Sequence, residues 1–442
     1  MTDDSHGVGR RGYLAGAAGV IGALAGCTGS AFGPPSFDRD QASFDPPVLG
    51  GDRTYPPDDQ VTMFRRGTRR LGYYPDETIP ESVTVDWQFP ANAVGHTAAK
   101  ASPRPTSDGE TVVIPADTGE VHAVTPAGER LWTRQTGATS MGIHGTPAIA
   151  HGVAYVGGYD GDLYAFDVAT GEQVWRTSRW AFDGSIAIGS SPAYWDGVLY
   201  VVVEYDDPPA GALWAVDAET GQPLWKDDRL LGMPHPSTAI DPVHERLLTG
   251  SNDGVVYCWE FPSLEFAWSF ETDWHVKGTM PTYDGAAFVG SWDGTFHRLA
   301  LSDGTEEWSF ETGEVIMSNP GVDPEAGVIY VGSDDNHVHA LDLETGEHLW
   351  ARDVGGHVIG SLTVTPETVL VGSYDTNLYA LDAATGAVRW RVPNQGHVTS
   401  AAVPLDGRIF YAERGVFSGY WDEDEPTVLQ TPGNAYCLVA DE

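Results

Sequence analysis

Residues 328–350 read VIYVGSDDNHVHALDLETGEHLW. A β-branched run is followed by an Asp/Asn-rich turn, an alternating segment, a Thr-Gly turn, and a last short run that closes on Trp350. Alternation with a period of two, punctuated by turn residues, indicates strands, and no helical period persists for more than one turn. The stretch therefore predicts consecutive antiparallel strands joined by tight turns.

The same pattern recurs along the chain, and each copy closes on a tryptophan. These residues are Trp87, Trp132, Trp175, Trp225, Trp268, Trp308, Trp350 and Trp390, spaced about 43 residues apart. A period of this length is typical of propellers and helical solenoids, and the strand pattern favours the propeller. Each unit is predicted to be one four-stranded antiparallel blade.

The chain ends decide the number of blades. Seven units lie between Trp87 and Trp390, and the remainder to about residue 440 has three strand-like runs without a closing tryptophan. The segment 84–89, TVDWQF, can supply the missing strand. Pairing the two ends would leave no open sheet edge. We therefore expect an all-β, eight-bladed β-propeller whose ring is closed by an N-terminal strand in the C-terminal blade.

Residues 379–390, YALDAATGAVRW, resemble the tryptophan-docking motif of PQQ-binding-like, quinoprotein-type β-propeller repeats. That superfamily includes the quinoprotein alcohol dehydrogenases and the outer-membrane assembly scaffold lipoproteins. The resemblance covers roughly residues 83–440, and it is weaker in the units that end at Trp132, Trp268 and Trp308. It implies that each tryptophan packs between neighbouring blades, where Ala and Gly leave room for the ring.

The N-terminus has the pattern of an export signal. Arg10 and Arg11 form a twin-arginine pair, an apolar stretch too short to span a bilayer follows, and Cys27 closes a lipobox-like sequence. We predict a signal peptide over 1–27 with lipidation of Cys27, although this cysteine could also be incidental to an ordinary signal peptide. The protein would then be extracytoplasmic, anchored to the outer face of the cytoplasmic membrane.

A flexible tether is expected over residues 28–62, because Gly, Pro, Ser and Asp dominate its first part without an apolar period. The propeller is expected over 63–442. The segment 63–67, MFRRG, precedes the first repeat and is expected to lie against the outside or the end of the ring.

Acidity dominates the composition, with 63 Asp+Glu against 24 Lys+Arg and a formal net charge of −39. A field of this sign repels phosphate, so nucleic acid is not an expected partner. The carboxylates are spread along the chain, and only three of the basic residues are lysines, Lys100, Lys226 and Lys277. Spread acidity with little lysine resembles proteins of halophilic microbes, of a haloarchaeal type, and is favoured over a local calcium-binding tract.

Quinoprotein dehydrogenases carry an adjacent Cys-Cys pair and a calcium-binding set, and the resemblance would demand both for that chemistry. This chain has no Cys-Cys pair; apart from Cys27 its cysteines are Cys258 and Cys437, both in strand-like runs and expected to be buried thiols. The turn aspartates Asp160 and Asp375 and their counterparts are expected to be turn residues rather than metal ligands. We therefore expect no catalytic residues, no metal and no cofactor, with PQQ and calcium as the alternative.

Histidines form the remaining pattern. His275, His357 and His397 each precede a Val at one point of the repeat, and we place Glu314 at the same point between them. In a propeller these positions ring one mouth of the central channel, where they could bind a metal, a haem or an anion. The alternative, which we favour, is that each His hydrogen-bonds at a strand entry.

Together these features predict a monomeric, non-catalytic scaffold that binds envelope proteins and touches the membrane only through its lipid anchor. Function in propellers resides in the loops of the disc rather than in the fold. The alternative is a PQQ- or metal-dependent oxidoreductase that uses the channel mouth.

Overall fold

Residues 328–350, the repeat unit described first, fold into the predicted antiparallel strands. In the computed structural model, β23 (Gly321–Asp323), β24 (Val328–Gly332), β25 (His337–Asp342) and β26 (His348–Asp353) form one antiparallel blade in that order. Side chains of β25 are buried between blades, whereas β26 alternates between exposed and partly exposed residues. We call the four strands of a blade A to D, from the channel outwards.

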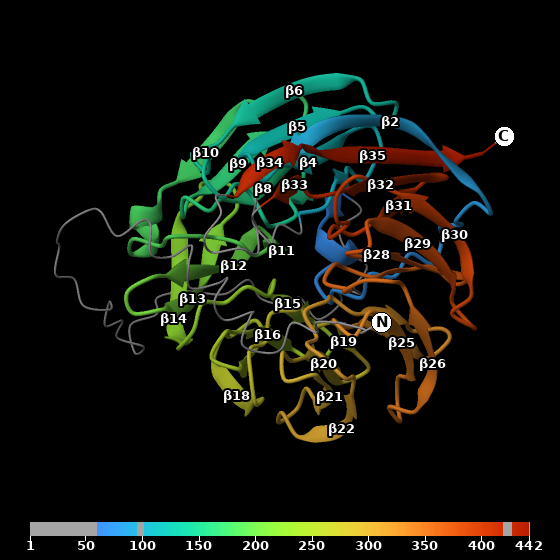
Figure 1. The fold of residues 1–442 in the computed structure, drawn as a ribbon. Coiled ribbons are helices and arrows are strands. Elements are labelled where there is room, and N and C mark those ends of the chain that lie inside the picture. The colour runs from blue at the N-terminus through green and yellow to red at the C-terminus, as the bar shows by residue number, and fades with distance from the viewer. Residues whose placement is uncertain (1–59, 95–100, 419–426, 442) are drawn as a thin grey trace.

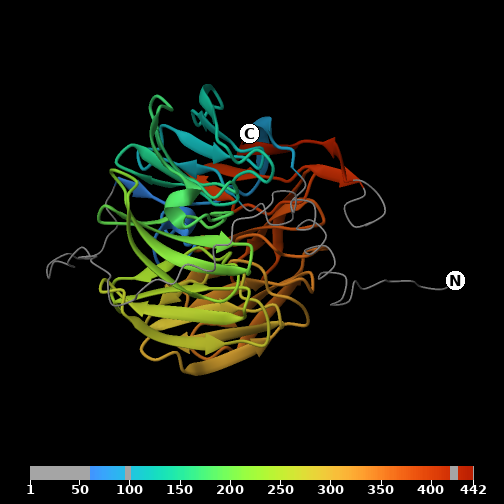
Figure 2. The ribbon, with the colours of Figure 1, turned by 90° about the vertical axis from the view of Figure 1, so that its left-hand side faces the viewer.

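The structure describes residues 60–94, 101–418 and 427–441, and these form eight four-stranded blades around a central axis (Figures 1 and 2). The predicted all-β, eight-bladed propeller is confirmed. Two single-turn 3-10 helices, η3 (Phe64–Arg66) and η4 (Arg179–Phe182), accompany the strands. Within the described ranges, no helix has the length and apolar character needed to cross a membrane.

Blades 1 to 4 follow one another along the chain. Their strands are β3 (Arg104–Pro105), β4 (Val112–Pro115), β5 (Glu120–Val124) and β6 (Arg130–Gln135); β7 (Ala148–Ala150), β8 (Val153–Gly157), β9 (Leu163–Asp167) and β10 (Gln173–Thr177); β11 (Ala193–Trp195), β12 (Val198–Tyr205), β13 (Ala210–Asp217) and β14 (Pro223–Leu230); and β15 (Ala239–Asp241), β16 (Arg246–Gly250), β17 (Val255–Glu260) and β18 (Phe266–Glu271).

Blades 5 to 8 continue the ring, with blade 6 given above. Their other strands are β19 (Thr282–Tyr283), β20 (Ala286–Gly290), β21 (Thr295–Ala300) and β22 (Glu306–Glu311); β27 (Thr363–Val364), β28 (Thr368–Gly372), β29 (Asn377–Asp382) and β30 (Val388–Pro393); and β31 (Val403–Leu405), β32 (Arg408–Ala412), β35 (Gly433–Ala440) and β2 (Val83–Asn92). A separate hairpin, β33 (Val416–Ser418) with β34 (Val428–Thr431), leaves blade 8.

Ring closure occurs as predicted, because β2 near the chain start pairs with β35 at its end. The antiparallel register places Val83 opposite Ala440 and Gln88 opposite Tyr436. Strand D of blade 8 therefore comes from the N-terminal part of the chain, and it pairs with the outer edge of β35.

The loops divide the disc into two faces. We call the side with the D-to-A loops and B–C turns the mouth face, and the side with the A–B and C–D turns the turn face. On the turn face, Asp382 Oδ1 accepts hydrogen bonds from the backbone N–H (2.9 Å) and Oγ1 (2.7 Å) of Thr385, and Gly386 follows with a φ of 67°. The same network recurs at Asp167, Asp217 and Asp342. This local network is the reason for the Asp-x-x-Thr-Gly pattern in the sequence.

Each of the eight tryptophans lies on a D strand, and most of them bond to the next blade. Their Nε1 groups donate to backbone carbonyls at 2.7–3.1 Å, in the pairs Trp87–Pro126, Trp132–Val168, Trp175–Ala218, Trp268–Leu301, Trp350–Ala383 and Trp390–Pro80. The Trp308 Nε1 is buried without a hydrogen-bond partner among the described residues, although its ring still lies on Gly346. The C–D turn of blade 4 faces Trp225 of blade 3 and has Leu264 in place of a glycine. Leu264 adopts the left-handed φ (59°) that the glycines have in the other turns.

A ring of hydrogen bonds, which we call the belt, connects the A strands on their mouth side. In each bond a backbone or side-chain N–H of one blade donates to a side-chain oxygen of a neighbouring blade, at 2.6–3.0 Å. The pairs are Ser102–Thr146, Thr146–Ser191, Ser191–Ser237, Ser237–Thr279, Thr279–Asn319, Asn319–Ser361 and Ala401–Ser102. The eighth position is Ala401, whose side chain offers no acceptor to blade 7.

The segment 63–67 was placed wrongly from the sequence. It lies inside the ring against the A strands, on the turn-face side of the belt, together with the rest of residues 60–74, which we call the plug. Its backbone bonds to blades 2, 4, 5, 6 and 7, for example from Ile240 N to Thr68 O (2.9 Å) and from Val364 N to Gly72 O (2.9 Å). In addition, β1 (Val61–Thr62) pairs with β7, so these two residues of the expected tether belong to the folded part.

Two buried arginines hold the plug in place. The Arg65 guanidinium donates to the carbonyls of Leu362 and Pro320, and Arg70 donates to Thr238 O at 2.9 Å. Backbone carbonyls of several blades thus solvate both cations, which explains how charged residues fill the centre of the ring. Burial lowers the pKa of Arg65 to about 9, so both the charge and its hydrogen bonds are present at neutral pH.

Candidate functional site: the mouth of the channel

The three histidines occupy equivalent places on the mouth face, and each links two blades. The Nδ1 of His357 lies 2.6 Å from Asp334 O, the Nδ1 of His397 lies 2.7 Å from Tyr374 O, and His275 makes the same contact with Asn252 O. Each carbonyl belongs to the B–C turn of the preceding blade. The ring nitrogen must donate to a carbonyl, so Nδ1 carries the proton and Nε2 is the acceptor in the neutral ring.

Glu314 does not share this position, contrary to our expectation. The backbone carbonyl of each His accepts from a B–C turn of its own blade, and in blade 6 that bond runs from Asp334 N to Val315 O (2.9 Å). Val315 is therefore the counterpart of the histidines, and the exposed Glu314 precedes it by one residue. The short Thr-Gly-Glu-Val-Ile sequence gave no marker for this one-residue shift.

The histidines are not gathered into a metal site. Within the residues that the structure describes, no group of three or more His, Cys, Asp or Glu side chains is placed to hold a metal ion. The turn aspartates bond locally: Asp253, Asp293 and Asp375 each accept from the backbone N–H two residues further on, at 2.7–2.9 Å. Burial lowers the pKa of His275 and His397, and Arg414 lowers that of His397 further, so both rings are neutral at pH 7.

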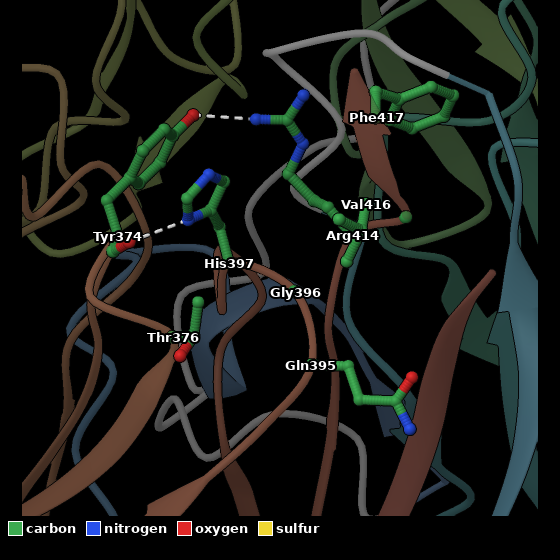
Figure 3. A pocket seen from close by; sticks show the side chains of 9 residues that line it. Tyr374, Thr376, Gln395, Gly396, His397, Arg414, Val416 and Phe417 are labelled. Carbon is green, nitrogen blue, oxygen red and sulfur yellow. Dashed lines mark hydrogen bonds between the residues drawn. The ribbon is translucent and has the colours of Figure 1, made fainter. Parts of the chain in front are cut away.

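A cavity of about 160 Å³ opens beside His397, between blades 7 and 8 (Figure 3). The His397 ring stacks on Tyr374, with ring centroids 4.1 Å apart and an interplanar angle of 11°. Arg414 Nη1 donates to the Tyr374 hydroxyl at 2.7 Å, which holds the guanidinium beside the stack. Val416 and Phe417, at the start of the β33–β34 hairpin, supply an apolar wall. The cavity thus combines a cation, a neutral imidazole and an apolar side.

Glu413 supports this cavity from below. Its carboxylate is fully buried and accepts from the backbone N–H of Gln395 and of Gly396, both at 2.8 Å, and from the Tyr436 hydroxyl at 2.7 Å. These bonds fix the loop that leads to His397 against β32 and β35. The sequence reasoning missed Glu413, Arg414 and Tyr374. The inserted segment 415–433 of the eighth blade was the available signal for this place.

The remaining sequence candidates fall in two groups. Cys258 and Cys437 are buried free thiols in blades 4 and 8, and burial raises the pKa of both, that of Cys437 to about 11. Neither is a reactive thiolate at neutral pH. Arg10, Arg11 and Cys27 lie outside the described residues.

Comparison with known families agrees with the architecture. The family model described as outer membrane protein assembly factor BamB matches residues 81–245, 209–323 and 316–419, which together are well over half of the chain. The chain belongs to this BamB family. The matched segments begin at the ring-closing strand and reach the hairpin beside the cavity, so the family covers nearly the whole ring.

Individual relatives match over shorter stretches. The chain is 27% identical over 223 residues to the outer membrane protein assembly factor BamB of Yersinia pestis, covering 47% of this chain and 53% of that protein. It is 27% identical over 221 residues to the serine/threonine-protein kinase AfsK of Streptomyces coelicolor, covering 49% of this chain and 25% of that protein. The matched part thus spans about half the length of the BamB relative and a quarter of the kinase.

Solved structures extend the likeness in fold. The quinohemoprotein alcohol dehydrogenase from Comamonas testosteroni superposes with a TM-score of 0.70 at 16% identity, covering 86% of this chain and 80% of that chain. At this identity the likeness concerns the propeller alone. The propeller is therefore shared with a protein named as a dehydrogenase and with the BamB family, so the function has to be argued from the site residues.

Proposed function

We propose that this member of the BamB family is a non-catalytic scaffold that binds other proteins in the cell envelope. The family membership supports an envelope-associated binding role. The observation that carries the proposal lies on the mouth face of blade 3, where large apolar side chains are presented to solvent: Trp180 is 76% exposed and Leu231 is 75% exposed.

These two residues sit in the loops on either side of blade 3. Trp180 belongs to η4, where the Arg179 guanidinium lies 5.2 Å from its ring centroid, and Leu231 directly follows β14. The exposed tip 206–209 of the long β12–β13 hairpin is on the same face, confirming the expected extension of blade 3. We call Trp180, Leu231 and residues 206–209 the blade-3 patch. Exposed aromatic and aliphatic groups on rigid loops are typical of protein-binding anchors.

Charge narrows the kind of partner. Asp183 and Asp253 lie beside the patch, Asp183 bonded to Lys226 (3.0 Å) and Asp253 to the backbone N–H of Leu231 (2.9 Å). With a net charge of −39, the whole surface attracts basic groups. The patch would therefore suit an apolar segment flanked by Lys or Arg on an envelope protein.

The test compares two faces of neighbouring blades. A Trp180→Ser/Leu231→Ser variant should lose at least 80–90% of the partner recovered by cross-linking in intact cells, because it removes the central anchors, each worth ~1–2 kcal/mol. Val243→Ser is the matched control, since Val243 is 62% exposed but belongs to the A–B turn of blade 4 on the turn face. Equal recovery with both variants would contradict the proposal.

We further propose that the chain is exported by the twin-arginine route and tethered through lipidated Cys27 to the outer face of the cytoplasmic membrane, as a monomer with an acidic surface suited to high salt. The sequence pattern over 1–27 supports export and tethering, and the spread acidity supports salt adaptation. Cys27→Ser should release the protein from membranes into the medium. Arg10→Lys/Arg11→Lys should retain it in the cytoplasm. Membrane retention of the Cys27→Ser protein would contradict the anchor.

The alternative remains a PQQ- or metal-dependent oxidoreductase at the channel mouth, supported by the likeness in fold to a quinohemoprotein. The described side chains do not fit it well, because no group of His, Cys, Asp or Glu is placed for a metal ion. Incubation of the purified protein with PQQ and calcium distinguishes the two functions. Stoichiometric PQQ binding with dye reduction would favour the enzyme. Absence of PQQ binding, together with loss of partner recovery in the Trp180→Ser/Leu231→Ser variant, would favour the scaffold.

A further inference from the structure

The hairpin that leaves blade 8 gives one of the three repeated histidines surroundings of its own. His275, His357 and His397 make the same contact with the preceding blade, but of the three only His397 lines the cavity of about 160 Å³. Val416 and Phe417, at the start of β33, form the apolar wall opposite (Figure 3). His397 is therefore the histidine to examine for ligand binding, and the other two copies are its natural controls.

The hydrogen bond to Tyr374 decides which nitrogen of His397 remains available. Nδ1 donates to Tyr374 O at 2.7 Å, so in the neutral ring Nε2 has the lone pair and no proton. That bond is the one hydrogen bond of the His397 side chain within the described ranges. Burial and then the charge of Arg414 lower the pKa of His397, which keeps the ring neutral at pH 7. Figure 3 shows the Nε2 edge turned towards Arg414 and the Tyr374 hydroxyl, so the cavity contains an acceptor that needs a donor.

The volume and the walls limit the ligand to about one aromatic ring. An apolar protein cavity of roughly 150 Å³ takes up benzene. The cavity of this protein has nearly the same volume, and it lies between the stacked rings of Tyr374 and His397 and the side chains of Val416 and Phe417. Aromatic rings pack favourably against such walls by offset stacking and edge contacts. A flat six-membered ring therefore fits the space.

Arg414 restricts the charge of the ligand. Its Nη1 donates to the Tyr374 hydroxyl at 2.7 Å, which holds the guanidinium beside the cavity. A fixed cation repels a cationic ligand and attracts the electron-rich face of an aromatic ring. The net charge of −39 opposes the approach of an anionic ligand. A neutral ring that carries a hydrogen-bond donor suits both the cation and the Nε2 of His397.

We propose that the cavity between blades 7 and 8 binds a neutral phenol group, whose hydroxyl donates to His397 Nε2 and whose ring packs against Val416 and Phe417. A phenol combines one flat ring with one O–H donor, and it is uncharged at pH 7 because its pKa is about 10. Free phenols and the tyrosine side chain of a bound protein share this group. The site is independent of the scaffold role, because no residue of the blade-3 patch lines the cavity.

The experiment compares two ligands of one shape on the full chain. In p-cresol a hydroxyl replaces one methyl group of p-xylene, so the two compounds differ in the donor and hardly in size. Titrations followed by NMR should show that p-cresol binds about tenfold more tightly, because only its hydroxyl bonds to Nε2. With ¹⁵N-labelled histidine, the Nε2 signal of His397 should shift with p-cresol and not with p-xylene. Equal affinity for the two compounds, or no binding of p-cresol, would overturn the proposal.

A pair of variants assigns the binding to His397. His397→Phe keeps a flat ring beside Tyr374 but removes the acceptor, so the preference for p-cresol over p-xylene should disappear. His275→Phe is the matched control, because it removes a histidine with the same carbonyl contact that lies outside the cavity. It should leave both affinities unchanged. A preference that survives in His397→Phe would contradict the proposal, and the comparison on the wild-type protein stands even if this variant folds poorly.

N-acetyltyrosinamide distinguishes the two sources of the phenol group. Displacement of bound p-cresol by this compound would identify a tyrosine side chain as an acceptable ligand. Binding of p-cresol that N-acetyltyrosinamide does not displace would identify a free phenol. Neither His397→Phe nor His275→Phe alters the blade-3 patch, so cross-linking through that patch tests the scaffold role separately.

Discussion

The two faces of the disc are built on opposite principles. On the turn face, four blades use one hydrogen-bond network of Asp, Thr and Gly, and tryptophans pack on the glycines. On the mouth face, one position near the end of strand B carries six different residue types in seven blades. These residues are Tyr159, Glu204, Asn252, Trp292, Asp334, Tyr374 and Arg414, and the backbone N–H of each donates to a carbonyl in the loop that leads into strand A of the same blade.

The difference shows how a repeat separates stability from recognition. Each blade has to pack against its neighbour in the same way, so the repeats can use the same Asp, Thr, Gly and Trp residues on the turn face. The mouth face keeps the backbone bond constant while the side chain varies, which makes each sector chemically distinct. Substitutions on the turn face should therefore cost stability, and those on exposed mouth-face positions should cost binding.

The largest loss should follow from Trp132→Ala. Trp132 is buried, its ring lies on Gly171, and its Nε1 donates to Val168 O at 2.7 Å. Removing it leaves a cavity between blades 1 and 2 and should lower the free energy of unfolding by about 3–5 kcal/mol, measured by urea titration. Trp180→Ala on the mouth face is the control and should change it by less than ~0.5 kcal/mol. Similar losses in both would erase the contrast between the faces.

A smaller loss is expected for Asp382→Ala, which removes both bonds to Thr385. Because Asp382 is only partly buried, the change should be only about 0.5–1.5 kcal/mol. Hydrogen bonds from Thr385 hold the pKa of Asp382 below its ordinary value. A carboxyl with a lowered pKa stabilises the fold above its unfolded pKa, near 3.9, and loses this contribution as pH falls through the folded value.

The difference between wild type and Asp382→Ala should therefore be full at pH 7 and shrink below about pH 4. Chemical denaturation at a series of pH values measures it. Asp206→Ala, in the exposed hairpin tip of the mouth face, is the control and should change the stability little at pH 7. A difference that grows towards acid pH would show that the Asp382 carboxylate does not support the turn.

The smallest effect should be a gain. Ala401→Ser would place a hydroxyl at the one belt position without an acceptor, and we expect about 0.5–1 kcal/mol of added stability. Ser361→Ala removes an existing belt oxygen, the acceptor for Asn319 Nδ2 at 2.8 Å, and should lower stability by a similar amount. Thermal unfolding of both variants against wild type measures the pair. Changes of the same sign would mean that the belt does not join the blades.

Much of the ring could be predicted because its repeated residues act locally. The tryptophan spacing and the turn residues gave the blade number, and the strand missing at one end matched the strand left over at the other. The plug could not be predicted, since Arg65 and Arg70 read as surface residues until the carbonyls around the channel are known. The belt was equally hidden: its positions recur with the repeat, but small polar residues are frequent in loops and do not reveal that they bond between blades.

The candidate site was predicted only in part. The histidines were placed at the mouth, yet their Nδ1 bonds to carbonyls of the preceding blade depend on how blades stack, which a sequence does not state. The Tyr374–Arg414 contact joins residues of two blades, and the His235–Glu204 contact joins blades 4 and 3. Contacts between copies of a repeat are set by assembly rather than by spacing.

The closing strand has a consequence for the order of folding. Strand β2 is made early but pairs only with β35, so the contact of Val83 with Ala440 spans about four fifths of the chain. The plug likewise needs A strands that are synthesised after it. Contacts of such long range slow folding and make it concerted. A chain that lacks β35 should leave β2 unpaired, so the ring can be completed only after β35 has been synthesised.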